Sequence, residues 1–145
     1  FAGDGPELNK LKEIAKELKI EKNVEFTGWL NFKDLIERIK EGKIGITCRS
    51  KGMANDFVVT SGLLQDMASG LAVLTPNTEA IKDFINENNG LTYYTENSQD
   101  LAKKIIYLLE NKKKLDELGK KAKEDVKVYD KDIIANQLLE AIENV

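Results

Sequence analysis

The stretch Met67-Ala68-Ser69-Gly70-Leu71-Ala72-Val73-Leu74-Thr75 decides the fold, because it joins the end of a helix to a buried strand. Apolar side chains recur at spacings of three and four before Gly70, which predicts an amphipathic helix. Thr60 or Ser61 is placed to cap the start of this helix, and Gly70 is placed to end it. The apolar run after Gly70 is short and stops at Pro76, so we expect a strand there.

The same alternation of helix and strand continues on both sides of this stretch. Apolar runs that we expect as short strands lie at residues 1–2, 24–27, 44–48, 71–75 and 91–94. We expect helices over residues 6–19, 32–42, 61–69 and 79–86 and from Ser98 onward, where the last helix covers residues 132–143, and a loop over residues 49–57. This alternation implies right-handed crossovers and a parallel sheet with helices on both faces. The predicted fold class is therefore α/β and Rossmann-like.

The composition narrows the chemistry that the chain can perform. Its 145 residues suit one domain, and no apolar run approaches the length of about 18 residues that a membrane-spanning helix needs. The 22 basic and 25 acidic residues are interleaved, so the net charge of -3 gives no reason to expect a nucleic-acid partner. No histidine and only one cysteine, Cys48, are present, which removes most zinc sites, Ser-His-Asp triads and disulfide frameworks. Any chemistry must use carboxylates, lysines, hydroxyls or backbone groups.

Two segments have the composition of a phosphate-binding turn, and each lies at the start of a predicted helix. Gly3-Asp4-Gly5-Pro6 offers backbone N–H groups and two glycines, which suits close approach to a phosphate. The alternative is a strand-to-helix turn that needs glycine only for its geometry. Val59-Thr60-Ser61-Gly62 opens a predicted helix, so its hydroxyls and free N–H groups suit a diphosphate. The alternative there is a plain N-cap.

Three further features have a functional and a structural interpretation. Gln65 and Asp66 can reach toward a ligand at the start of their helix, or they form its solvated face. Cys48 lies beside Arg49 at a strand end, but a free cysteine is more often a small core residue, and no histidine is present to activate it. The lysines within residues 112–123 are expected as a solvated helix face, with a peripheral contact to an anionic membrane as the alternative.

Four motifs together resemble those of a known family. They are Gly3-Asp4-Gly5-Pro6, Phe26-Thr27-Gly28, Met67-Ala68-Ser69-Gly70 with the strand that follows it, and Asn89-Gly90-Leu91. In this order and spacing the chain resembles the carboxyl-terminal half of the family-4 (group 1) glycosyltransferases, which have the GT-B architecture. The resemblance covers essentially the whole chain, and the last helix is similar to the family's end.

The resemblance implies the donor-binding half of a retaining glycosyltransferase, which transfers a sugar from a nucleotide-activated donor to a saccharide or lipid-linked acceptor. Members of this type usually need no metal, so no metal or other cofactor is expected, and we assign no catalytic residue. In the family the donor diphosphate lies against the helix that corresponds to residues 61–69. The donor-binding residues expected from the motifs are Gly3, Gly5, Thr27, Asp56, Thr60, Ser61, Gly62 and Gln65.

Three positions depart from the family's pattern. Gln65 stands where the family has a glutamate, so a ribose contact here would be an amide hydrogen bond, which is weaker than a charged one. The upstream glutamate of the family's Glu-x7-Glu pair falls at Phe57, and Asp56 replaces it only if the loop shifts by one residue. Residues 58–60 replace the usual glycines and crowd the approach to the backbone. These departures imply a divergent donor specificity or reduced activity.

The resemblance also implies that residues 1–145 form a domain that is incomplete at its amino terminus, because the family's domain begins one β-α unit earlier. That unit supplies an arginine and a lysine that clamp the pyrophosphate, and a separate amino-terminal domain binds the acceptor. We therefore expect the chain alone to be inactive and to be marginally stable or to self-associate through its uncovered surface. The expected process is polysaccharide or glycolipid biosynthesis, in the cytoplasm or at the inner face of the membrane.

Two other classes of function stay open at this point. A non-catalytic interaction module with a GT-B-like fold is motivated by Gln65 and the altered loop before it. A GT-B nucleotide-sugar epimerase or a phosphorylase is the third alternative. The lack of histidine and of a cofactor-binding lysine motif argues against that alternative.

Overall fold

The computed structural model describes residues 1–144, which form two compact units. The first unit is Phe1–Arg38, and the second begins at Ile39. Helix α1 (Leu8–Glu17) lies in the first unit, and helix α2 (Phe32–Lys40) runs across the boundary. None of the helices described is both long and apolar enough to cross a membrane.

No strand forms among residues 1–38, all of which are described, so the strands expected at residues 1–2 and 24–27 are wrong. Two isolated bridges join Ala2 and Gly3 to Gly28 instead. The Gly3 N–H donates to the Gly28 carbonyl at 2.8 Å, and the Thr27 N–H donates to the Phe1 carbonyl at 3.0 Å. These few bonds join only two short segments, which is too little pairing for a strand ladder.

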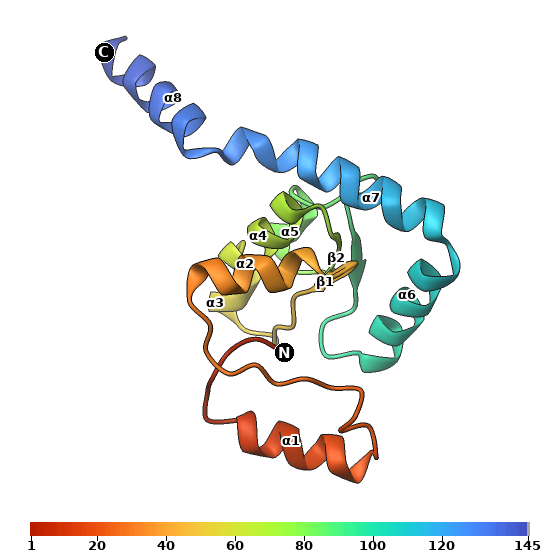
Figure 1. Cartoon of the computed structure of the whole chain (residues 1–145). Coiled ribbons are helices and arrows are strands. Elements are labelled where there is room, and N and C mark those ends of the chain that lie inside the picture. Colours follow the sequence, from red (N-terminus) through yellow and green to blue (C-terminus); the bar gives the residue numbers. More distant parts are fainter. Residues whose placement is uncertain (145) are drawn as a thin grey trace. The chain divides into compact units, whose positions relative to one another are not determined.

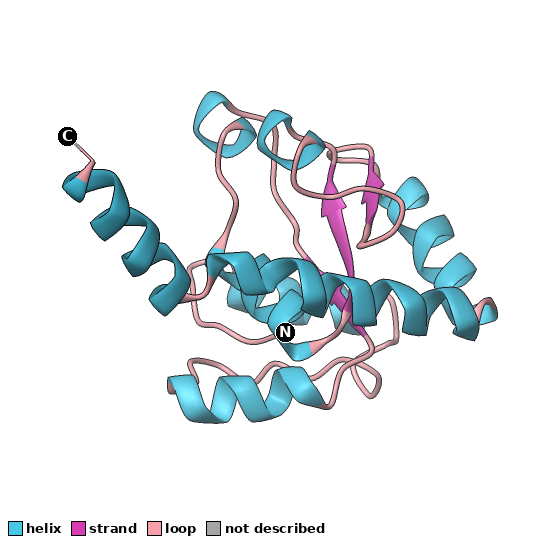
Figure 2. Ribbon diagram, turned by 90° about the horizontal axis from the view of Figure 1, so that it is seen from above, coloured by secondary structure: helices cyan, strands magenta, loops and turns pink. Residues whose placement is uncertain are grey.

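The second unit is built on a parallel sheet, whose strands are magenta in Figure 2. The strands β1 (Ile44–Ile46), β2 (Ala72–Pro76) and β3 (Leu91–Tyr93) lie in that order, so β2 is central. β2 is buried along its whole length, because one hydrophobic core packs on Val73 and another packs on Ala72 and Leu74. The parallel α/β sheet that the sequence predicts is therefore confirmed.

Helix α4 (Ser61–Ser69) leads into β2 as predicted. The Thr60 hydroxyl oxygen accepts a hydrogen bond from the Leu63 N–H at 3.2 Å, so Thr60 is the N-cap. Gly70 has a φ of 81°, a left-handed conformation that glycine adopts without a steric penalty, and it ends the helix. Leu63 and Met67 are buried in the core on the Val73 face of the sheet.

Helices α6 (Ser98–Glu110) and α7 (Lys112–Asp125) follow β3 in the chain (Figure 1). Leu108 of α6 and Leu118 of α7 are fully buried in the core with Ala72 and Leu74. Ala122 of α7 belongs instead to the core on the α4 side. Helix α7 therefore joins the two cores, and it packs against both β2 and α4.

Besides differences of one or two residues at most element ends, the second unit departs from the sequence-based expectation at three other places. A one-turn helix, α3 (Met53–Asp56), forms inside the expected loop, because the Asn55 and Asp56 N–H groups both reach the Gly52 carbonyl. Helix α5 (Glu79–Lys82) is shorter than expected. Asn97 caps α6 in place of the predicted Ser98, since its side-chain oxygen accepts from the Asp100 N–H at 3.0 Å.

The chain ends in a short 3-10 segment, η1 (Val126–Tyr129), followed by helix α8 (Lys131–Glu143). The apolar stripe predicted for the last helix is present, but its side chains are exposed. They are Ile133, Ile134, Leu138, Leu139 and Ile142. The spacing of apolar residues therefore predicted the helix correctly, whereas burial of the stripe is not achieved within the described chain.

Candidate functional site

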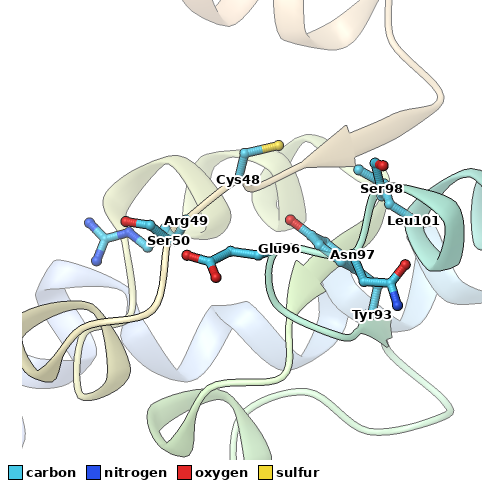
Figure 3. Close-up of a pocket in the computed structure, with 8 residues that line it drawn as sticks. All are labelled: Cys48, Arg49, Ser50, Tyr93, Glu96, Asn97, Ser98 and Leu101. Carbon is cyan, nitrogen blue, oxygen red and sulfur yellow. The ribbon is translucent and has the colours of Figure 1, made fainter.

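The carboxyl ends of the three parallel strands meet at one edge of the sheet, and two hollows open there. The larger one, of about 380 Å³, lies between the end of β1 and the turn after β3, and we call it the β1–β3 pocket (Figure 3). The smaller one, of about 10 Å³, lies between the end of β2 and the start of α4, and we call it the α4 hollow. A cavity of that size holds about one water molecule. A larger ligand would have to sit over the α4 hollow or displace its side chains.

Polar side chains from two loops line the β1–β3 pocket. Figure 3 shows Glu96 extended toward the segment that holds Arg49 and Ser50. One Glu96 carboxylate oxygen accepts a hydrogen bond from the Lys51 N–H at 3.1 Å, which joins the two loops. Cys48 is exposed at this pocket, so the interpretation of Cys48 as a core residue is wrong. The reason is that β1 ends at Ile46, two residues before the thiol.

Tyr93 forms the buried side of the same pocket. Its hydroxyl donates to the Thr47 carbonyl at 2.7 Å and so connects the end of β3 to the segment after β1. Burial, followed by the charge and hydrogen bond of the neighbouring Cys48, raises the pKa of the Tyr93 hydroxyl well above its usual range. Tyr93 therefore stays protonated at neutral pH and acts as a hydrogen-bond donor that fixes the shape of the pocket.

The first turn of α4 presents hydrogen-bond donors at this edge of the sheet. Thr60 uses its oxygen as the cap acceptor, which leaves its hydroxyl proton available to a ligand. The N–H groups of Ser61 and Gly62 lie in the first turn, where an α-helix offers no carbonyl partner. Apart from its chain neighbours and the backbone of its own helix, no described atom lies within 4 Å of the place where a Cβ on Gly62 would be, so a ligand has room to approach. This arrangement suits an anion, because the helix dipole is positive at this end.

Arg49 is a functional candidate that the sequence indicates only as a neighbour of Cys48. Its side chain is half-buried and lines both the β1–β3 pocket and the α4 hollow, where Thr60 also lies. No described acidic residue forms an ion pair with its guanidinium. A half-buried guanidinium without an ion pair, in the same hollow as the N-cap residue Thr60, is suited to a phosphate. Its sequence signal is that it is one of only two arginines and directly follows an apolar run.

Asp56 and Gln65 lie on α3 and α4, and neither of them lines the α4 hollow or the β1–β3 pocket. Asp56 is the last residue of α3, Gln65 lies in the second turn of α4, and both are half-buried. Neither side chain forms a hydrogen bond with any other described residue. Both therefore keep their polar atoms available, and their roles in donor binding stay predictions.

The other expected donor residues, Gly3, Gly5 and Thr27, belong to the first unit. The Thr27 hydroxyl donates to the Gly28 carbonyl at 3.1 Å, so it already takes part in holding this turn. Gly3 has a φ of 134°, which favours glycine, and the Gly5 carbonyl accepts from the Leu8 N–H at 3.0 Å. The turn geometry alone accounts for Gly3, and a role for these three residues in donor binding stays a prediction.

Asp66 faces the sheet and not the start of its helix. Its carboxylate lies over Gly45 of β1, where a Cβ would come within 2.5 Å of the Asp66 Oδ2. Burial raises the pKa of Asp66 to about 6 from 3.8. The interpretation of Asp66 as a side chain that reaches a ligand at the helix start is therefore replaced by one in which it packs on the backbone of Gly45.

We expect Asp66→Asn to stabilise the protein at pH 7.5 and to leave its stability unchanged at pH 4. The folded state holds the Asp66 proton more tightly than the unfolded state, so stability is lost as the pH rises from about 4 to about 6. After allowance for the partial exposure of the side chain, the gain at pH 7.5 should be about 1 kcal/mol. Urea denaturation of both proteins at the two pH values measures this difference. A gain that is equal at both pH values would contradict the assignment.

Among residues 1–144, no group of three or more cysteine, aspartate or glutamate side chains is arranged to hold a metal ion. The expectation that the function needs no metal stays a prediction.

Comparisons with known proteins add a family and a fold. The family described as "Glycosyl transferases group 1" matches residues 1–125. The chain is 33% identical over 111 residues to alpha-monoglucosyldiacylglycerol synthase of Streptococcus pneumoniae, covering 74% of this chain and 23% of that protein. It is 26% identical over 139 residues to GDP-Man:Man(3)GlcNAc(2)-PP-Dol alpha-1,2-mannosyltransferase of Dictyostelium discoideum, covering 96% of this chain and 26% of that protein. The chain thus spans about a quarter of the length of these curated relatives.

Solved structures agree on the architecture. A glycosyltransferase from Rickettsia africae matches with a TM-score of 0.82 and 19% identity, covering 99% of this chain and 38% of that one. Anabaena HepE in complex with UDP-glucose matches with a TM-score of 0.81 and 18% identity, covering 99% of this chain and 40% of that one. At these identities the similarity establishes the fold alone.

Proposed function

The chain belongs to the group 1 glycosyl transferases, and from this premise we propose that it forms the donor-binding half of a retaining glycosyltransferase. In this proposal it binds a nucleotide-activated sugar, which is transferred to a saccharide or glycolipid acceptor held by another part of the protein. The observation that carries the proposal is the first turn of α4, which presents free N–H groups and Thr60 beside the half-buried Arg49. This combination is suited to the diphosphate of such a donor.

Each candidate residue has a distinct task in this proposal. The N–H groups of Ser61 and Gly62 and the Thr60 hydroxyl donate hydrogen bonds to the diphosphate, and Arg49 neutralises part of its charge. Gln65, one turn further along α4, donates or accepts a hydrogen bond at a ribose hydroxyl. Asp56 accepts a hydrogen bond from a hydroxyl of the donor sugar.

The family's usual independence of metal is part of the proposal. Here α4 and Arg49 would supply the positive charge that balances the leaving diphosphate. Anabaena HepE, which is similar in fold, has been solved with UDP-glucose, so a UDP-sugar is the first donor to test. A cytoplasmic location and a role in polysaccharide or glycolipid assembly belong to the same proposal.

A non-catalytic module of the same fold is the second candidate. It is favoured by Gln65, which replaces a carboxylate of the family's pattern with an amide. If the module only binds, Gln65→Glu should leave donor affinity unchanged and produce no turnover. Measurable transfer by the unmodified protein would exclude this candidate.

We expect the protein to bind at least one nucleotide sugar and Gly62→Ala to weaken that binding about tenfold. The added methyl group has open space in the folded chain, so any loss of affinity reflects a ligand that approaches the first turn of α4 closely. Calorimetric titrations with UDP-, GDP- and ADP-sugars measure both affinities, and circular dichroism checks that the variant is folded. Folded protein that binds none of the three donors would overturn the proposed function.

A further inference from the structure

A separate pocket of about 540 Å³ opens beside β3, between helix α6, the start of α7 and the turn before β3. It shares no lining residue with the β1–β3 pocket or the α4 hollow. Its volume lies within the range of about 300–1,000 Å³ that is typical of small-molecule sites. We call it the lysine pocket, because Lys103, Lys104 and Lys114 line it.

The carboxylates of Glu87 and Asp100 also line this pocket, so its three lysines leave an excess of one positive charge. None of the three lysines forms an ion pair with a described residue, and Lys114 only donates to the Glu87 carbonyl at 2.8 Å. Asp100 is the acidic residue one turn before Lys103 and Lys104, but its carboxylate accepts from the Tyr94 N–H at 2.8 Å. Lys114 also lies in the first turn of α7, which contains no acidic residue and is the positive end of that helix.

Two other lysines of α7 form ion pairs, whereas Lys112, Lys120 and Lys123 form none with the described residues. Lys121 forms ion pairs with Glu124 and Asp125, and Lys113 lies 3.8 Å from a Glu117 carboxylate oxygen. The chain has 25 acidic residues, and its net charge is -3. Because these carboxylates leave lysines of α7 outside the pocket unpaired as well, the lack of an ion pair does not by itself set the lysine pocket apart. Its three lysines are distinguished because they line one pocket together with Tyr107.

The apolar part of the pocket indicates the kind of anion. Leu91, at the start of β3, and Tyr107, which is 45% exposed, contribute apolar surface to the same pocket as the lysines. Lysine ammonium groups bind phosphate as point charges, and a tyrosine ring packs well against a sugar or another ring. A ligand with both a phosphate and a ring would use both parts of the pocket.

We infer that the lysine pocket binds a small, soluble, phosphate-bearing molecule of the sugar-phosphate class, at a site separate from the proposed donor site. The phosphate contacts Lys103, Lys104 and Lys114, and the ring packs on Tyr107. The pocket is concave and offers only three cations, which favours a small ligand over the broad contact that an anionic membrane makes.

Residue-resolved NMR titration of the protein with glucose 1-phosphate tests the inference. Saturable shifts are expected in the amides of residues 87–91, 100–107 and 114, and glucose should produce none. The triple variant Lys103→Gln/Lys104→Gln/Lys114→Gln should bind at least about tenfold more weakly. A control variant with the same change of charge on the first unit, Lys12→Gln/Lys22→Gln/Lys33→Gln, should bind within about twofold of the unmodified protein. Tyr107→Ala should weaken glucose 1-phosphate but not inorganic phosphate.

The outcomes separate this inference from its competitors and from the proposed function. Equal losses in the two triple variants would mean a nonspecific charge effect and would overturn it. So would binding only to phosphatidylglycerol vesicles, with no shift on addition of glucose 1-phosphate. The lysine-pocket variant should bind nucleotide sugars with the affinity of the unmodified protein, because the two sites are separate. For the same reason, a failure of the unmodified protein to bind nucleotide sugars would not affect the glucose 1-phosphate test.

Discussion

Gly119→Ala is expected to lower the free energy of unfolding by about 3 kcal/mol. A Cβ at this position of α7 would lie closer than 3.0 Å to the backbone carbonyl oxygen of Gly70 and 3.4 Å from the backbone nitrogen of Ala72. Backbone atoms cannot rotate away as the end of a side chain does, so α7 would have to move off the loop. That movement would disturb Leu118 and Ala122, which α7 contributes to two separate cores.

The size of this effect can be separated from the general effect of placing alanine in a helix. Gly62→Ala is the matched control, because its added methyl group meets no described atom within 4 Å outside its chain neighbours and its own helix backbone. Alanine has the higher helix propensity, so the control should be neutral or gain up to about 1 kcal/mol. Urea denaturation followed by circular dichroism compares the two variants with the unmodified protein. Similar stabilities for both variants would show that the close approach of α7 to the loop at Gly70 does not hold the fold together.

The sequence predicted the second unit well, because local signals and tertiary packing agree there. The Thr60 cap, the Gly70 stop and the buried run of β2 were each predicted, and each is present. In the first unit the segment at residues 24–27, in which Val24 and Phe26 alternate with polar residues, formed no strand. A strand exists only where another segment completes its hydrogen-bond ladder, and periodicity carries no information about that partner.

Differences at helix ends arise from competition between neighbouring caps. Asn97 and Ser98 are both good N-cap residues, and the side chain of Asn97 takes the role by bonding to the Asp100 N–H. After α5, the Asn89 side chain accepts from the Asn86 N–H at 2.8 Å and organises the turn before β3. Such choices depend on side-chain geometry that a pattern of residue types does not contain.

The candidate site was predicted in part, since the residues that follow the family's motifs were identified and Arg49 was not. Thr60, Ser61 and Gly62 begin α4, the helix that the sequence predicted. Gly3, a candidate in the first unit, already donates its N–H to the Gly28 carbonyl and has a positive φ that favours glycine, so the turn itself explains this residue. Arg49 was missed because a single arginine has no pattern, and its significance comes from half-burial without an acidic partner among the described residues.

Arg49→Glu is expected to weaken nucleotide-sugar binding about a hundredfold, which corresponds to about 3 kcal/mol. The substitution removes the cation that lines the α4 hollow together with Thr60 and places a carboxylate where the proposed diphosphate is bound. Lys12→Glu, on the exposed face of α1, makes the same change of net charge and should alter affinity less than twofold or so. Calorimetric titration of the two variants in parallel measures the difference.

The pattern across donors distinguishes a diphosphate contact from other contacts of Arg49. UDP-, GDP- and ADP-sugars share the diphosphate and differ in the base, so Arg49→Glu should weaken every donor that the protein binds by a similar factor. Arg49→Lys keeps the charge but loses the bidentate geometry, and it should retain part of the affinity. If only one donor is weakened, Arg49 contacts the base. If the binding of no donor is weakened and the Lys12→Glu control behaves as expected, the α4 turn binds the diphosphate without Arg49. The N–H groups of Ser61 and Gly62 can do so, because they do not depend on that side chain.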